Sequence, residues 1–504
     1  MRLHSLFALA VIAALLTGLG RPSAAADDAA PSPKPPVTAE ATITVSPQQW
    51  GVSTRYIGGT EGSAGFDIAD LVDCGINTLR IYGDMSRFEP VDDDGAYGSP
   101  SIAEIKADPN IIPWQRWDEV MNSPYSPFVK RTPEVTWRTV FADLSKAGIC
   151  TVISLRNRDT NLNPSWMAAV PKTEQDWNEW WEYVFAIAYW LNVRNDYRVD
   201  DYEVLNEPDN APQQGWLGTR EEYCEMVKRT KDALDYLYRT YLPGRTYHVH
   251  APVTAGPNWV RGVLDDAGGS FDSLNVHWYA WWDKGEFVRK MHALLAESGH
   301  PDYPIWLSEW GTYDVSYNEW YMGLAMVENL IRFSQPGDDH VYGSHLFSFY
   351  DWVYEGNAGW GIIKGDGTRH ATYYALRLAN RALNGAKPTF QATCRAGVPT
   401  PANSAEDGGL RAIATRDPDG KVNLLVLNWS ENVTYNTRAD LPEVCRAGVP
   451  TPAEKWAGTI RQFNAQVRDE VVGQTAVEDG ISRFAVPPQS VVLVTYGATI
   501  APHQ

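Results

Sequence analysis

Basic residues are scarce in this sequence. Its 504 residues include 43 lysines and arginines against 62 aspartates and glutamates, which gives a formal net charge of −19. A protein that binds nucleic acid needs a basic stripe to neutralise phosphates, and the sequence offers none. We therefore expect no nucleic-acid partner.

Cysteine is also scarce, with five residues in the whole chain. Cys74, Cys150 and Cys224 lie in apolar or helical surroundings and are expected to be buried thiols. Cys394 and Cys445 each open the same nine-residue segment, CRAGVPTPA, and a disulfide between them is one possibility that the sequence leaves open. The chain lacks both a CxxC motif and a His/Cys cluster, so we expect no metal. It also lacks a GxGxxG loop after the first predicted strand, so we expect no nucleotide cofactor.

Long apolar runs are absent except at the N-terminus. There Arg2 and His4 precede an apolar run over residues 6–19, and Ala24-Ala25-Ala26 follows as a small-residue cleavage site. This pattern is typical of a secretory signal peptide, which we place at residues 1–26 with cleavage near Ala26. It predicts a secreted or periplasmic protein with no membrane segment in the mature form. Residues 27–41, rich in Ala, Pro and Asp, are expected to be a linker.

Residues 42–384 alternate between short apolar runs and longer amphipathic stretches, which is typical of repeated strand–helix units. Eight such units favour a (β/α)8 barrel over a doubly wound sheet, for which a glycine-rich phosphate loop is missing. Residues 385–504 show short alternating runs separated by turn residues, which predicts a small antiparallel β-sandwich. The eight expected strands lie near residues 56–58, 78–81, 151–155, 202–205, 248–251, 274–277, 305–308 and 345–349.

Two of these strands end on a glutamate. The fourth runs into Asn206-Glu207-Pro208 and the seventh into Ser308-Glu309-Trp310-Gly311. Reactive groups of (β/α)8 enzymes lie at the carboxyl ends of the strands, so the two carboxyl groups are expected to face each other across a substrate. A retaining glycosidase needs such a pair, one protonated and one ionised, about 5–5.5 Å apart. Either glutamate alone could simply form an ion pair, but the pair at these two strand ends favours catalysis.

These motifs resemble glycoside hydrolase clan A, and within it most of all family 39. Leu79-Arg80-Ile81 on the second strand and His277-Trp278-Tyr279 on the sixth add to the likeness, which covers about residues 45–384. The resemblance implies that Glu207 is the acid/base and Glu309 the nucleophile.

The same resemblance implies roles for six further residues, all of them in substrate binding. Asn206 would hydrogen-bond a sugar hydroxyl, and Arg80 would hold the nucleophile ionised. Tyr279 would orient that carboxylate, and His277 would lie near the acid/base. Trp352, after the eighth strand, and Trp310 are candidate platforms for sugar rings, although ordinary packing is an equal possibility for any tryptophan.

The sequence thus predicts a secreted retaining glycosidase whose partner is a carbohydrate. A neutral glycan suits this acidic chain better than an acidic one, unless the binding cleft is locally basic. A transglycosylase of the same fold and a catalytically silent carbohydrate-binding protein stay open as alternatives. Substrate, linkage and oligomeric state are not determined by the sequence.

Overall fold

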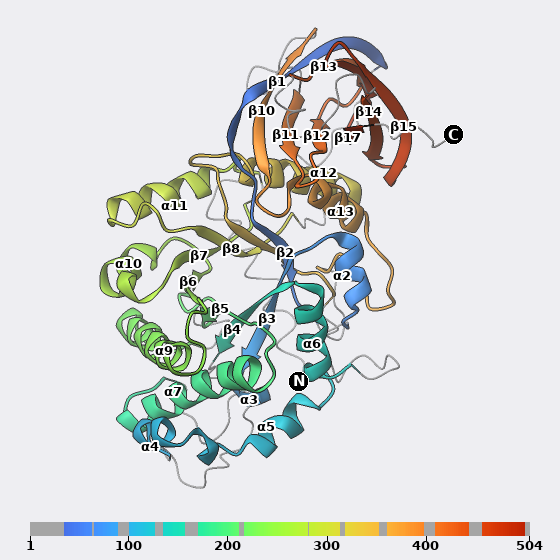
Figure 1. Ribbon diagram of the computed structural model, residues 1–504. Coiled ribbons are helices and arrows are strands. Elements are labelled where there is room, and N and C mark those ends of the chain that lie inside the picture. Colours follow the sequence, from blue (N-terminus) through green and yellow to red (C-terminus); the bar gives the residue numbers. More distant parts are fainter. Residues whose placement is uncertain are drawn as a thin grey trace, which may run out of the picture.

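The larger part of the chain is a closed barrel of eight parallel strands (Figure 1). The computed structural model describes residues 35–62, 65–88, 100–125, 135–156, 170–210, 216–280, 282–312, 318–351, 360–397, 409–442 and 456–498. All eight predicted strands are present, in sequence order around the barrel. They are β2 (Tyr56–Thr60), β3 (Thr78–Asp84), β4 (Cys150–Arg156), β5 (Asp201–Val204), β6 (His248–Thr254), β7 (Ser273–Trp278), β8 (Ile305–Trp310) and β9 (Gly343–Leu346).

Helices surround the barrel, and the two longest of those described, α7 and α9, begin at side-chain caps that the sequence encodes. Thr219 and Glu222 form a capping box at the start of α9, as Thr173 and Asp176 do at the start of α7. The described helices are α2 (Ile68–Cys74), α3 (Met85–Phe88), α4 (Ile102–Ala107), α5 (Trp114–Met121), α6 (Trp137–Ala147), α7 (Glu174–Tyr189), α9 (Arg220–Tyr241), α10 (Val260–Ala267), α11 (Glu286–Glu297), α12 (Glu319–Phe333) and α13 (Ala371–Leu383). Shorter turns of 3-10 or π geometry are η1 (Pro109–Ile111), η2 (Trp190–Arg194) and η3 (Gly268–Ser270).

A second, mostly antiparallel sheet closes on itself above the barrel (Figure 1). Its first strand, β1 (Val37–Val52), precedes the barrel in the sequence. It pairs in parallel with β13 (Val433–Asp440) and antiparallel with β10 (Pro388–Ala396). The predicted linker at 27–41 and the barrel boundary at residue 42 therefore differ from the structure, because Ala41, Ile43 and Val45 alternate inward and fill this second core. The other strands are β10 (Pro388–Ala396), β11 (Leu410–Arg416), β12 (Val422–Asn428), β13 (Val433–Asp440), β14 (Trp456–Phe463), β15 (Arg468–Glu478), β16 (Ile481–Val486) and β17 (Ser490–Ala498).

The two sheets are joined through α12 and α13, which lie between them (Figure 1). One face of the second sheet belongs to the barrel's own hydrophobic cluster, through Leu425 on β12, Leu493 on β17 and Phe463 on β14. Phe463 packs so closely against α12 that a Cβ at Gly323 would lie 2.7 Å from its ring. Because the cores are continuous at this contact, the second sheet acts as a packing partner of the barrel.

We expect Ile43→Ala to lower the free energy of unfolding by about 2–5 kcal/mol, because it deletes a fully buried side chain from the second core. Urea denaturation of the two proteins measures the difference. The neighbouring residue Thr44 is exposed, and Thr44→Ala serves as the matched control with an expected change within about 0.5 kcal/mol. Equal stabilities for the wild type and Ile43→Ala would contradict the placement of β1 in this sheet.

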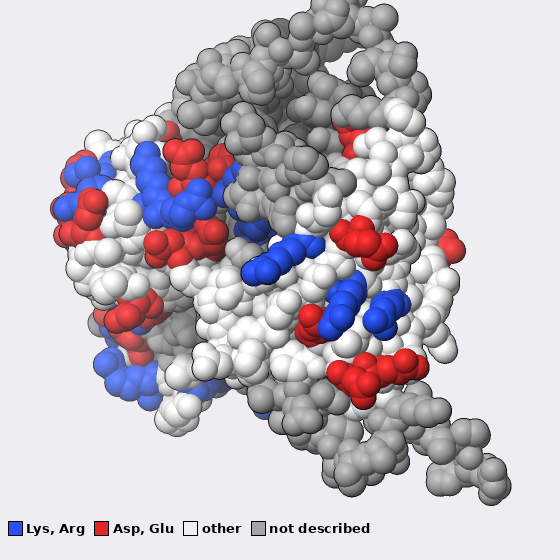
Figure 2. Space-filling view, turned by 90° about the horizontal axis from the view of Figure 1, so that it is seen from above, with Lys and Arg blue, Asp and Glu red and all other residues white. Residues whose placement is uncertain are grey.

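The surface seen from above carries acidic and basic side chains together. Figure 2 shows the two signs interleaved over the described part of that face, with neither forming a continuous field. Within the described ranges, every helix is too short or too polar to cross a bilayer. The predicted signal peptide lies outside the described residues.

Candidate active site

The candidate site is built where the carboxyl ends of β3, β5, β7 and β8 meet at one mouth of the barrel. At the end of β5 the backbone leaves the extended conformation, because Leu205 and Glu207 have φ values of 63° and 48°. A non-glycine residue in this left-handed region costs about 1–3 kcal/mol and persists only where its surroundings hold it. A hydrogen bond from the Glu207 N–H to the Val253 carbonyl, 2.8 Å long, is one such restraint. The turn directs Asn206 and Glu207 toward the groups on the neighbouring strands.

Glu309, at the end of β8, accepts hydrogen bonds on both carboxylate oxygens. Its Oε1 accepts from the Tyr82 hydroxyl and from Arg80 Nη1, each at 2.7 Å, and its Oε2 accepts from the Tyr279 hydroxyl at 2.8 Å. Burial alone would raise the pKa of Glu309. The charges of His277 and Arg80, with the hydrogen bonds from the two tyrosines, outweigh burial and lower the pKa to about 2. Glu309 is therefore ionised at any ordinary pH.

Arg80 lies at the centre of the site and is fully buried. Its guanidinium donates from Nη1 to Glu309, from Nε to Glu203 at 2.6 Å and from Nη2 to Asn206 Oδ1 at 2.7 Å. Burial opposes its charge, but Glu203, Tyr82 and Glu309 raise the pKa of Arg80. One planar fork thus fixes the relative positions of groups from three strands, which a lysine could not do.

Glu207 lies close to Glu309. Its Oε1 shares a 2.7 Å hydrogen bond with His277 Nδ1, and its Oε2 accepts from Asn210 Nδ2 at 3.1 Å. One oxygen of each glutamate and one ring nitrogen of His277 lie within 4.8 Å of one another. The two carboxyl groups therefore lie next to each other at the mouth of the barrel.

His277, on β7, connects the two glutamates. Besides the bond to Glu207, its Nδ1 lies 3.5 Å from Glu309 Oε2, and its Nε2 shares a 3.1 Å hydrogen bond with Ser308 Oγ. Burial lowers the pKa of His277, but the charge of Glu309 and the contact with Glu207 raise it overall above its usual value. The protonated imidazole is therefore stabilised by the two carboxyl groups, both of which lie close to its Nδ1.

These three side chains could in principle hold a metal ion, since their ligand atoms are close enough. Glu309, however, already accepts three hydrogen bonds, one of them from a guanidinium that repels cations. The donor set suits a carboxylate that reacts with carbon better than one that binds metal.

The structure brings six of the eight predicted site residues together, namely Arg80, Asn206, Glu207, His277, Tyr279 and Glu309. Trp352 lies outside the described residues. Trp310 is fully buried and packs edge-on against Phe333 on α12, with ring centroids 5.3 Å apart. Its ring has no face free for a sugar, so the prediction that Trp310 binds substrate is corrected to a packing role behind the nucleophile strand.

A different tryptophan lies at the mouth of the barrel. Trp360 is half-buried, and its ring stands edge-on to Tyr279 with centroids 6.5 Å apart. Because Tyr279 donates to Glu309, Trp360 is close to the place where a reacting sugar would lie. It is the described tryptophan best placed for stacking.

The sequence did not single out three further residues of the site. Tyr82 donates to Glu309. Glu203 accepts from Arg80, and Asn275 Nδ2 in turn donates to Glu203 at 2.8 Å. Strand alternation could have indicated Tyr82, because it is two residues after Arg80 and therefore on the same side of its strand. Glu203 is a charge within an apolar strand, which needs a buried partner.

Three other acids near the strand ends form hydrogen bonds or ion pairs. Glu61 accepts from the Tyr125 hydroxyl at 2.7 Å, Asp84 pairs with Arg156 at 2.7 Å, and Asp351 accepts from the Gly361 N–H at 2.7 Å. They support the walls of the site and leave the glutamate pair as its reactive centre.

Comparisons with known proteins add evidence on the fold. No family profile matches the sequence, and no curated protein resembles it in sequence. Among solved structures, a glucosidase from Croceicoccus marinus superposes with a TM-score of 0.65 at 14% identity, over 92% of this chain and 100% of that one. The GH39 enzyme from Xanthomonas axonopodis pv. citri gives 0.61 at 15%, over 92% and 98%. A monomeric beta-xylosidase from Caulobacter crescentus CB15 gives 0.62 at 15%, over 91% and 100%. The chain therefore shares the fold of glycoside hydrolases of clan A, the group that its motifs resemble.

Proposed function

We propose that this protein is a retaining glycoside hydrolase in which Glu309 is the nucleophile and Glu207 the acid/base. The observation that carries the proposal is the pair of buried carboxyl groups at the barrel mouth, with oxygens within 4.8 Å of each other. Retaining enzymes hold the two groups about 5–5.5 Å apart, whereas inverting enzymes leave about 6.5–9.5 Å for a water molecule. The spacing supports a covalent glycosyl-enzyme intermediate.

In the first step, Glu309 attacks the anomeric carbon while Glu207 gives its proton to the leaving oxygen. Glu309 suits this role because its pKa of about 2 keeps it ionised. Glu207 faces it with His277 and Asn210 as hydrogen-bond partners, both of which orient the carboxyl group. In the second step, Glu207 takes a proton from water, which releases the sugar with its original configuration.

Asn206 is positioned to bind the sugar that is attacked. Its Oδ1 accepts from Arg80, so its amide NH2 is directed away from the guanidinium. A hydrogen bond from this amide to a ring hydroxyl would strengthen as positive charge develops at the anomeric carbon.

The choice of sugar is open at this level. Solved structures with the same fold include a glucosidase, a xylosidase, a xyloglucanase and an arabinofuranosidase, so the fold accommodates several glycans. We propose a glycan that stacks on Trp360. Export by the predicted signal peptide is part of the same proposal, since polysaccharides lie outside the cell.

The test is a hydrolysis screen of residues 27–504 against aryl glycosides and plant, bacterial and algal polysaccharides. Product anomers are read by NMR directly after mixing, before mutarotation. We expect cleavage with retained configuration. A product of inverted configuration would refute the covalent mechanism, and sugar binding without any cleavage across the panel would favour the binding-protein alternative.

A further inference from the structure

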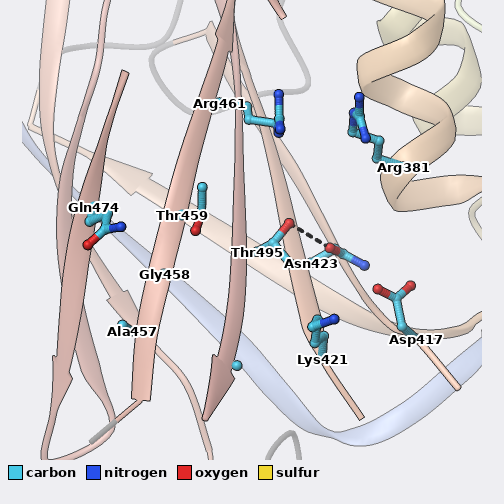
Figure 3. Close-up of a pocket in the computed structure, with 11 residues that line it drawn as sticks. Arg381, Asp417, Lys421, Asn423, Ala457, Gly458, Thr459, Arg461, Gln474 and Thr495 are labelled. Atoms are coloured by element: carbon cyan, nitrogen blue, oxygen red, sulfur yellow. Dashed lines mark hydrogen bonds between the residues drawn. The ribbon is translucent and has the colours of Figure 1, made fainter. Parts of the chain in front are cut away.

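A groove of about 650 Å³ lies on the second sheet, away from the strand ends that form the barrel mouth (Figure 3). Its floor is the outer face of β12, β17, β14 and β15. Along these strands the side chains alternate, so that Leu425 and Leu493 on this face pack against the barrel. On the same face, the next side chains are polar: Asn423 lies two residues before Leu425 on β12, and Thr495 lies two residues after Leu493 on β17.

The polar floor is a row across four neighbouring strands. The register pairs Asn423 with Thr495, Thr495 with Thr459, and Thr459 with Gln474. Each of these side chains carries a hydroxyl or an amide, which are the groups that hydrogen-bond sugar hydroxyls. Of the described residues that line the groove, none is aromatic, so recognition here would rest on hydrogen bonds and charge and not on stacking.

Asn423 is the strongest sign that this row binds a ligand. The residue is only 2% exposed, and its Oδ1 accepts from the Thr495 hydroxyl at 2.9 Å. Its Nδ2 has no hydrogen-bond partner among the described residues. Figure 3 shows this nitrogen turned away from Thr495, on the side of Asp417. A buried donor without a partner is destabilising, and a ligand oxygen that accepts from it would remove that cost.

The end of the groove opposite Asp417 is cationic. Arg381 of α13 and Arg461 of β14 both stand there (Figure 3). They share one buried carboxylate, Asp469, at 3.3 Å and 3.7 Å, and Arg377 holds the same carboxylate more closely, at 2.6 Å. Arg377 also pairs with Asp73 at 3.0 Å. Among the described residues, however, Asp469 is the one carboxylate that Arg381 and Arg461 share, so these two part-exposed guanidinium groups present an excess of positive charge to the groove.

At the other end the charges cancel. Asp417 is paired with Lys387 at 2.7 Å, and Lys421 with Asp419 at 2.6 Å. The groove therefore has one anion-binding end and one neutral, hydrogen-bonding end. This local excess of positive charge is found on a chain whose formal net charge is −19.

We propose that this groove binds a sugar that carries a carboxylate, with the carboxylate at Arg381 and Arg461 and the hydroxyls along the row from Gln474 to Asn423. Guanidinium groups bind carboxylates through paired, charge-assisted hydrogen bonds, and the amide of Asn423 donates to a hydroxyl oxygen. The site would hold uronic-acid units of a glycan while the barrel acts elsewhere on it. Binding here requires no turnover, so the inference can be tested even if the proposed function fails.

The experiment is calorimetric titration of residues 27–504 with D-glucuronate, D-glucose and inorganic sulfate, on the wild type and on Arg381→Gln and Arg461→Gln. We expect glucuronate to bind at least tenfold more tightly than glucose and sulfate, and each substitution to weaken it by about tenfold. Arg438→Gln, an exposed arginine on β13 of the same sheet, is the matched control and should bind as the wild type does.

Three results would overturn the proposal: equal affinity for glucose, binding of sulfate as tight as that of glucuronate (an adventitious ion only), or glucuronate affinity unchanged in both arginine variants. Thermal midpoints establish that each variant is folded. If an arginine variant does not fold, Gln474→Ala, which shortens an exposed side chain at the end of the row, provides the comparison. Unchanged glucuronate affinity in Gln474→Ala would then refute the assigned orientation and with it the proposal.

Discussion

Replacing Glu309 with alanine is expected to lower kcat/KM by on the order of 10⁴–10⁶-fold, because the substitution removes the attacking group itself. Added azide should restore cleavage of an aryl glycoside, since the small anion fits the space that the carboxylate leaves. Azide attacks from the nucleophile's side of the sugar, so the product is a glycosyl azide of inverted configuration. NMR of that product is the measurement.

Glu207→Ala is the matched comparison for this result. It leaves Glu309 able to form the covalent intermediate from substrates with good leaving groups, and azide then attacks that intermediate. The expected product is a glycosyl azide of retained configuration. Exchanged outcomes for the two variants would reverse the assignment of nucleophile and acid/base.

Arg80→Met is expected to have the second-largest effect, on both stability and catalysis. It leaves Glu203 and Glu309 buried without the guanidinium that bridges them, which should cost about 3–5 kcal/mol of unfolding free energy. It also frees Asn206, so kcat/KM should fall by at least about 10²-fold. Urea denaturation and initial rates give the two quantities.

The pH profile separates loss of charge from simple damage to the fold. The pKa of Glu309 is depressed, so its ionised form stabilises the protein above the usual carboxyl range, and that contribution is lost as pH falls toward 2. Without Arg80 the pKa of Glu309 rises, and the acid limb of kcat/KM should move to higher pH. Arg80→Lys keeps the charge and should move the limb less, although one ammonium cannot reach all three partners. An acid limb at the same pH in Arg80→Met and the wild type would refute the electrostatic role of Arg80.

The positions of the barrel strands and the reactive residues at their ends could be predicted from the sequence. The eight barrel strands follow from short apolar runs between amphipathic stretches, since a strand covered on both faces must be apolar throughout. Glu207 and Glu309 stood out because each ends such a run. Arg80 could be named only through the resemblance to clan A, which implies an arginine that holds the nucleophile ionised.

Other residues could be placed only by packing. Trp310 is the last residue of β8 and Trp360 follows β9 in the chain, yet one packs against α12 and the other lies beside Tyr279. Nothing local distinguishes them, because burial of a side chain depends on which helix covers it. The N-terminal strand β1 is a similar case: its inward alternation is visible, but its partners on β10 and β13 are more than 330 residues away in the sequence.

The sequence by itself determined the class of fold, the two glutamates and the acidic character of the chain, because periodicity and residue type are local properties. The tertiary structure alone decided three further features: the closure of the second sheet by β1, the Arg80 network that lowers the pKa of Glu309, and the cationic groove at Arg381 and Arg461. Each depends on side chains that are distant in sequence and meet only when the sheets close. The strength of a hydrogen bond or a charge pair depends on distances that no one segment of the chain specifies.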